Sequence, residues 1–161
     1  PIKESLIAEG VSPEQISKNL AEIKANKVSQ KYYDNLVLGA DSVIDLENEL
    51  ISKPENREHA REIMMKLNGK KHFLISSVCI SKNGSMIWNN TDKAELEMKY
   101  LGIPQIDEYL SKISDEILYA YNVYQIEGIG KTLFKNISGN SDTIMGLPIE
   151  NIKNYLENLK I

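Results

Sequence analysis

The chain has 161 residues, which is enough for one domain with a hydrophobic core. Its net charge of −4 gives no long-range attraction for a nucleic acid polymer or an anionic membrane, and no apolar run reaches the ~20 residues of a membrane span. The single cysteine, Cys79, excludes a disulfide within these residues and is typical of a reducing compartment. We therefore expect a cytoplasmic protein in which this thiol is buried and unreactive.

The first regular element predicted along the chain is a helix that begins after Ser12. Ser12 is suited to cap it, Pro13 occupies its first position, and Gln15 completes a capping box. Apolar residues then recur at helical spacing as far as Ile23. Lys24 flanks this apolar stripe, so its side chain either faces inward or lies along the surface.

A short apolar run from Leu36 to Ala40 predicts a buried strand, which we expect to end just before Asp41. Residues 43–51 are typical of a hairpin or of two short strands with a turn between them. Asn56 can cap a second helix, and Gly69 is placed to end that helix with a residue of positive φ.

The second half of the chain opens with a long hairpin. Residues 72–81 and 86–100 are predicted strands on either side of Asn83–Gly84, a strong turn signal. Helices and strands alternate around this hairpin, which predicts an α/β protein with a mixed sheet flanked by helices.

Shorter elements are expected beyond the hairpin. Pro104 opens a helix and Ser114 can cap another. The glycine-bearing stretch 119–130 is interpreted as a functional loop, a strand follows over 132–137, and a last helix starts at Pro148.

Three charged residues stand where apolar segments end. Asp41 follows the first predicted strand, Lys53 is held extended by the proline after it, and Glu127 lies among glycines that would let the backbone approach a flat base. A carboxylate that accepts a proton from water or holds a divalent ion, together with lysines for phosphate oxygens, is the minimum for phosphoanhydride hydrolysis.

Ordinary alternatives exist for each of these residues. An aspartate after a strand is as often a turn residue, a lysine before proline is commonly solvated, and a lone glutamate is commonly exposed. His59 and His72 lack the spacing of metal ligands and are interpreted as structural. Spacing alone therefore indicates a phosphate site and nothing finer.

Four segments, in this order and at these separations, resemble the Maf family of nucleotide pyrophosphatases. The linking pattern Ala60 to His72 and the helix Leu20 to Ala25 resemble the family as well. No single motif is specific, but the ordered set spans essentially the whole chain. The four segments are Gly39-Ala40-Asp41-Ser42-Val43, Ser52-Lys53-Pro54, Ile126-Glu127-Gly128-Ile129-Gly130 and Gly146-Leu147-Pro148.

The resemblance implies a fold and a reaction. Maf proteins have an α/β fold similar to the inosine triphosphate pyrophosphatases, with a central cleft between two lobes. They cut a nucleoside triphosphate between the α and β phosphates and need a divalent cation, Mg²⁺, Mn²⁺ or Co²⁺. We therefore expect a nucleoside triphosphate as the small-molecule partner; the protein ligands of the metal are not predicted.

The resemblance also assigns roles to individual residues. Asp41 matches the family's proposed proton acceptor, which activates the attacking water. Lys53 matches a lysine that contacts phosphate, and Lys24 matches another. Ser42 and Glu127 match positions tied to substrate choice. Family members acting on 7-methyl-GTP carry glutamate at the last position, where those acting on standard nucleotides carry glutamine. A purine-like or modified base, in a modified or non-standard nucleotide, is therefore expected.

The chain also departs from the family pattern. The family begins with a strand and a Ser-rich, Arg-bearing loop that cradles phosphate, and nothing before Ser12 resembles this unit. Ala120 stands where lysine is common. We therefore expect residues 1–161 to form a single Maf-like domain that is incomplete at its amino terminus. Apolar surface left open by a missing strand would favour a homodimer.

A second class of function fits the same residues. A catalytically impaired protein that binds nucleotides, or that regulates septum formation, would carry the same segments, since Maf proteins are associated with septum formation. Release of pyrophosphate is the observation that separates an enzyme from such a binding module.

Overall fold

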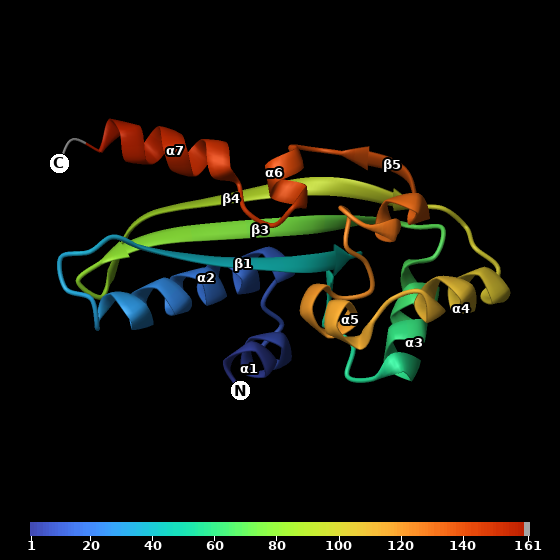
Figure 1. The fold of residues 1–161 in the computed structure, drawn as a ribbon. Coiled ribbons are helices and arrows are strands. Elements are labelled where there is room, and N and C mark those ends of the chain that lie inside the picture. The colour runs from blue at the N-terminus through green and yellow to red at the C-terminus, as the bar shows by residue number, and fades with distance from the viewer. Residues whose placement is uncertain (160–161) are drawn as a thin grey trace.

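A computed structural model describes residues 1–159 of the chain (Figure 1). Its sheet has five strands in the order β2-β1-β3-β4-β5, and each pairing is antiparallel. The strands are β1 Val37–Leu46, β2 Glu49–Ile51, β3 Lys71–Lys82, β4 Ser85–Met98 and β5 Phe134–Ser138. The helices are α1 Ile2–Ala8, α2 Pro13–Ser29, α3 Arg57–Leu67, α4 Ile103–Ser111, α5 Asp115–Tyr121, α6 Ser141–Ile144 and α7 Ile149–Asn158, with a 3₁₀ helix at Ile129–Leu133.

The α/β class with helices flanking a sheet is confirmed, but the described strands include no parallel pair, where a mixed sheet was expected. Two tight turns explain part of this difference, because a two-residue turn reverses the chain and forces antiparallel pairing. Glu47 and Asn48 form one such turn and Asn83 and Gly84 the other, all with positive φ.

The helix caps follow the sequence pattern, except that the Gln15 side chain donates to Oδ1 of Asn19 at 2.9 Å and does not complete the expected capping box. The Ser12 hydroxyl accepts the Gln15 N–H at 3.3 Å at the start of α2, and Asn56 caps α3 through the N–H of His59 at 2.8 Å. Two helices were not predicted. No side chain of α1 is buried, so it leaves no apolar stripe to detect, and α6 is a single turn of four residues, too short to show a helical repeat.

Helices cover both faces of the sheet (Figure 1). Along β3, Ser77 and Cys79 face α2, while Ser76 and Val78 face α6 and α7. Cys79 is 1% exposed, which confirms the expected burial of this cysteine, and burial raises the pKa of its thiol. The described residues contain no helix long and apolar enough to cross a membrane.

Helix α2 lies unusually close to β1. A Cβ atom on Gly39 would sit 2.5 Å from the carbonyl oxygen of Ala21 and 2.9 Å from Cβ of Ala25, so only glycine allows this approach. The Ser17 hydroxyl adds a hydrogen bond of 3.1 Å to the backbone carbonyl of Asp41. This contact fixes the helix beside the strand that carries the predicted catalytic residue.

The largest cluster of buried side chains lies at one end of the sheet, where α3, α4 and α5 come together (Figure 1). Within it, Nε2 of His72 and the hydroxyl of Tyr124 are 2.8 Å apart, and His72 is 1% exposed. Burial lowers the pKa of His72 to about 4, so the ring is neutral at physiological pH. The structural role expected for this histidine is confirmed.

Candidate active site

A cleft of about 560 Å³ runs along an open stretch of β1. Strand β2 pairs only with residues 44–46 of β1, so residues 37–43 have no neighbouring strand on that side among those described. Five consecutive residues, Ala40 to Ile44, line the cleft. Successive side chains of a strand point to opposite faces, so only a cleft at a strand edge can receive both Asp41 and Ser42.

All five residues singled out in the sequence line this one cleft. They come from α2, from β1, from the segment after β2 and from the loop after α5. The residues are Lys24, Asp41, Ser42, Lys53 and Glu127. The roles assigned to them by resemblance remain predictions, but their meeting in one place is a property of the fold.

Asp41 occupies the middle of β1 and not its end, so the expected strand boundary was wrong. The strand continues because residues 43, 44 and 46 are buried in the sheet, which the lone charge at position 41 obscured. The Asp41 side chain is 13% exposed and accepts a hydrogen bond from Nζ of Lys24 at 2.6 Å. The same ammonium group donates to the Ala40 carbonyl oxygen at 3.1 Å. Lys24 therefore fixes one carboxylate oxygen of Asp41.

Ser42 projects from the opposite face of β1. Its hydroxyl lies 3.0 Å from that of Ser76 on β3 and 3.3 Å from the carbonyl oxygen of Gly146, the residue after the α6 cap. Both faces of the strand therefore contribute polar groups to the cleft. One face supplies a charged pair and the other supplies hydroxyl and carbonyl groups.

Asn122 joins the two segments that carry Lys53 and Glu127. Its side-chain amide donates to the Ser52 carbonyl at 3.2 Å, and its side-chain oxygen accepts the Val123 N–H at 2.8 Å. Asn122 itself has a φ of 73°, a conformation that asparagine tolerates better than most residues. Lys53 and Glu127 both remain exposed, as ligand-binding groups at a cleft wall require.

The glycines beside Glu127 have a different role from the one expected. Neither Gly128 nor Gly130 lines the cleft. A Cβ on Gly130 would lie 2.5 Å from the Gln125 carbonyl oxygen, so this glycine allows the loop to fold against itself. Gly130 therefore shapes the loop that presents Glu127, and neither glycine lies where a base in the cleft would bind.

The sequence reading missed several lining residues. Lys3 reaches the cleft from α1, Tyr121 and Gln125 come from the end of α5 and its loop, and Met145 follows α6. No sequence signal marked Lys3, since α1 itself was not predicted. The described lining thus holds lysines at positions 3, 24 and 53 against carboxylates at 41 and 127, a balance suited to an anionic ligand.

The donor set of the cleft limits how a metal can bind. Across residues 1–159, no group of three or more His, Cys, Asp or Glu side chains could hold a metal ion. The two carboxylates in the cleft, Asp41 and Glu127, do not form a closed protein cage. They do fit Mg²⁺, which takes one or two carboxylates and completes its shell with water and substrate phosphates.

Comparison with known proteins shows which proteins this chain is similar to. A protein named nucleoside triphosphate pyrophosphatase from Pelagibacter ubique (strain HTCC1062) is 63% identical over 99% of this chain and 82% of its own length. One of the same name from Ruegeria pomeroyi is 34% identical over 96% of this chain and 78% of its own length. A 7-methyl-GTP pyrophosphatase from Brucella abortus biovar 1 is 35% identical, over 92% and 74% respectively.

The family described as Maf-like protein matches residues 1–159. This match covers the sheet, the helices on both its faces and every residue that lines the cleft. The chain therefore belongs to the Maf-like protein family.

Proposed function

We propose that this protein hydrolyses a nucleoside triphosphate to the monophosphate and pyrophosphate. The observation that carries the proposal is the meeting of Lys24, Asp41, Lys53 and Glu127 in one cleft, which Lys3 also lines. The names of the relatives support the reaction type, because proteins similar over nearly the whole chain are named nucleoside triphosphate pyrophosphatases.

Asp41 is the proposed acceptor of the proton from water. Its Oδ1 atom is held by Lys24, and its Oδ2 atom has no hydrogen-bond partner among the described residues. A water molecule on Oδ2 would be oriented to attack the α-phosphorus. The new P–O bond forms as the bond from the α-phosphorus to the α–β bridging oxygen breaks, so pyrophosphate leaves and the water proton passes to Asp41.

The lysines of the cleft supply electrostatic stabilisation. Negative charge builds up on the departing pyrophosphate, and a fixed ammonium group close to it lowers the barrier. Lys53 is the proposed contact of this kind, since the Asn122 amide fixes the backbone carbonyl just before it. Lys3 lines the same cleft from α1 and is a further candidate.

A divalent cation, Mg²⁺, Mn²⁺ or Co²⁺, is the proposed cofactor. Asp41 is the carboxylate of the described cleft that could hold it, directly or through a water molecule, with phosphate oxygens and water as the other ligands. When bound, the ion would neutralise charge on the phosphates. Addition of EDTA should abolish pyrophosphate release, and each cation should restore it to a different extent.

Glu127 is the proposed determinant of base choice, and the proposed substrate is a modified or non-standard purine nucleotide. A carboxylate accepts hydrogen bonds, so it suits a base edge that donates them, such as the N1–H and amino group of a guanine. The similarity to a relative named 7-methyl-GTP pyrophosphatase supports this choice. Glutamine at the same place would offer one donor and one acceptor and would change the ranking of bases.

A nucleotide panel tests both parts of the proposal. Pyrophosphate release is measured with GTP, 7-methyl-GTP, UTP and dTTP for the wild type, for Glu127→Gln and for Glu116→Gln, an exposed control on α5 outside the cleft. We expect release by the wild type and a changed substrate ranking only in Glu127→Gln. An unchanged ranking contradicts the role of Glu127. Saturable nucleotide binding without release favours the rival function, a catalytically impaired binding or septum-formation regulatory protein.

Assembly and location stay predictions. The uncovered edge of β1 includes Leu38, which is 44% exposed, and this exposure supports the proposed homodimer. Sedimentation velocity over a range of concentrations would show it as a doubled mass. The cytoplasmic location and the single-domain organisation expected from the sequence are likewise predictions.

A further inference from the structure

A row of three polar residues crosses the sheet from β1 at the cleft, through β3, to β4. Ser42 on β1 is the register partner of Ser76 on β3, and Ser76 is the register partner of Asp92 on β4. Residues directly opposite in neighbouring strands share a face, so all three side chains lie on the face covered by α6. Ser76 is fully buried, which makes its hydrogen bonds costly to break.

Helix α6 is fastened to this row by a single residue. The Thr143 hydroxyl donates to Oδ2 of Asp92 at 2.6 Å, and the Thr143 carbonyl oxygen accepts the Ser76 hydroxyl at 2.9 Å. Thr143 is fully buried between them. Because α6 has only four residues, these bonds to the sheet decide where the helix lies.

The turn at the end of α6 connects Thr143, which is bonded to Asp92, with Gly146 at the cleft. The Gly146 N–H bonds to the Thr143 carbonyl and the Leu147 N–H to the Asp142 carbonyl, each at 3.0 Å, which is the Schellman pattern. Gly146 has a φ of 99°, as this pattern requires. The turn directs the Gly146 carbonyl oxygen at the Ser42 hydroxyl, 3.3 Å away.

The hydroxyl protons of Ser42 and Ser76 both have hydrogen-bond acceptors within the protein. Ser76 can donate to the Thr143 carbonyl or to Ser42, and Ser42 can donate to Ser76 or to the Gly146 carbonyl. In either arrangement the proton of Ser42 has an acceptor inside the protein. Ser42 therefore turns lone pairs toward the cleft and accepts a hydrogen bond from a ligand. A phosphate group ionised at neutral pH has no proton to donate, so its partner lies elsewhere on the nucleotide.

We propose that Asp92, Thr143 and Ser76 are positioning residues that hold Ser42 as a hydrogen-bond acceptor for the nucleoside part of the substrate. Ser42 recognises an O–H or N–H group of the sugar or base, while the lysines hold the phosphates. This inference rests on the proposed function and deepens it by dividing the cleft into a nucleoside side and a phosphate side.

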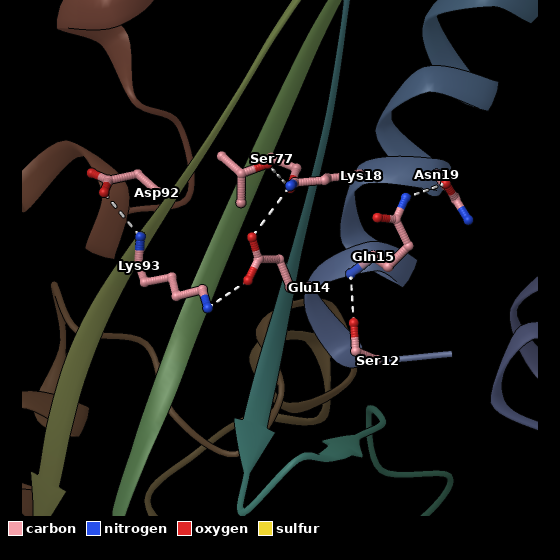
Figure 2. Close-up of polar contacts among 9 residues, drawn as sticks. Ser12, Glu14, Gln15, Lys18, Asn19, Ser77, Asp92 and Lys93 are labelled. Atoms are coloured by element: carbon pink, nitrogen blue, oxygen red, sulfur yellow. Dashed lines mark hydrogen bonds and ion pairs between the residues drawn. The ribbon is translucent and has the colours of Figure 1, made fainter. Parts of the chain in front are cut away.

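The opposite face of the same strands supplies a matched control. One register position away, Ser77 on β3 is hydrogen-bonded to Thr91 on β4 at 2.9 Å, and neither residue lines the cleft. In Figure 2 the Lys93 side chain extends toward Glu14 of α2, while Asp92 is directed away from it. Ser77→Ala thus removes a side-chain hydrogen bond between the same two strands and leaves the row that ends at Ser42 unchanged.

The first experiment removes the hydrogen bond between Thr143 and Asp92, at the end of the row farthest from Ser42. Thr143→Val removes the hydroxyl at nearly constant volume, Thr143→Ser keeps it, and Asp92→Leu removes its acceptor. Loss of one hydrogen bond of this kind predicts a KM for the nucleotide raised about fivefold in Thr143→Val and in Asp92→Leu, with kcat changed less than about twofold. The double variant should be no worse than either single variant. Thr143→Ser and Ser77→Ala should keep the wild-type KM.

The second experiment separates positioning from a general structural effect. Ser42→Ala and Thr143→Val should weaken binding of the nucleotide about fivefold, yet leave unchanged the affinity for inorganic triphosphate, which has no nucleoside. Equal weakening for both ligands, or a wild-type KM in both Thr143→Val and Asp92→Leu, overturns the inference while the proposed hydrolysis stands. Failure of the wild type to bind or hydrolyse any nucleotide overturns the proposed function itself and this inference with it.

Discussion

The two faces of β1 meet the cleft with different chemistry. On the α2 face, Asp41 is bound to Lys24 by a charged contact of 2.6 Å. On the α6 face, Ser42 contacts only a hydroxyl and a carbonyl oxygen, at 3.0 and 3.3 Å. A charged pair suits proton transfer and a phosphate, whereas fixed neutral dipoles suit recognition of an uncharged group. The proposed function therefore places the chemistry on one side of the plane of the sheet and recognition of the nucleoside on the other.

The largest effect should come from the charged face. Asp41→Asn removes the proposed proton acceptor, and we expect kcat to fall about 10²- to 10⁴-fold with a smaller change in KM. Asp45→Asn is the matched control, because Asp45 lies on the same strand outside the cleft. Steady-state pyrophosphate release measures both variants. If the KM values of the different nucleotides became more alike while kcat stayed unchanged, Asp41 would instead be assigned to recognition of the substrate.

Acid should weaken the fold as a whole, because His72 is buried against Tyr124 and Phe134 of the largest cluster of buried side chains. The pKa of this buried ring is about 4 when folded and about 6.5 when unfolded, because burial disfavours the charged form. The unfolded state therefore binds the proton more readily. The contribution of the neutral His72 ring to the free energy of unfolding is fully present above pH 6.5. This contribution falls by up to about 3 kcal/mol as the pH drops to 4.

Urea unfolding across this pH range measures the effect of His72. His72→Gln should have a lower stability at neutral pH, since it disturbs the Tyr124 contact, but a shallower loss between pH 6.5 and 4. An equally steep loss in this variant would place the acid sensitivity in other groups.

A moderate effect is expected from the packing that brings α2 to the charged face. Gly39→Ala places a methyl group 2.5 Å from the Ala21 carbonyl oxygen, and overpacking of this kind costs about 1–3 kcal/mol. Because Lys24 moves with the helix, kcat should fall as well. Gly102→Ala is the control, since its added methyl meets no atom closer than 3.7 Å. Urea unfolding and pyrophosphate release would be compared for both variants.

The smallest effect should come from the ion pair between Glu14 and Lys93. The two side chains are 35% and 46% exposed, so solvent screens their attraction. Lys93→Met should cost less than about 1 kcal/mol and leave activity unchanged. A clear loss of activity would show that the position of the α2 start matters to Asp41, and so would link the pair to the charged face.

Local signals in the sequence determined the individual elements. Caps, turns and alternating apolar residues act between near neighbours, so Ser12, Asn56 and Asn83–Gly84 were sufficient to place two helices and the long hairpin. The ordered segments around Asp41, Lys53 and Glu127 were sufficient to identify the family and five of the residues that line the cleft.

The tertiary structure decided how those residues are used. That β1 continues past Asp41, that its edge is open there, and that Ser42 aligns with Ser76 and Asp92 all depend on strand register. The bonds that fix Ser42 join residues 34 and 104 positions apart in the chain. No local sequence pattern encodes such contacts, because they arise only when the sheet forms and α6 packs against it.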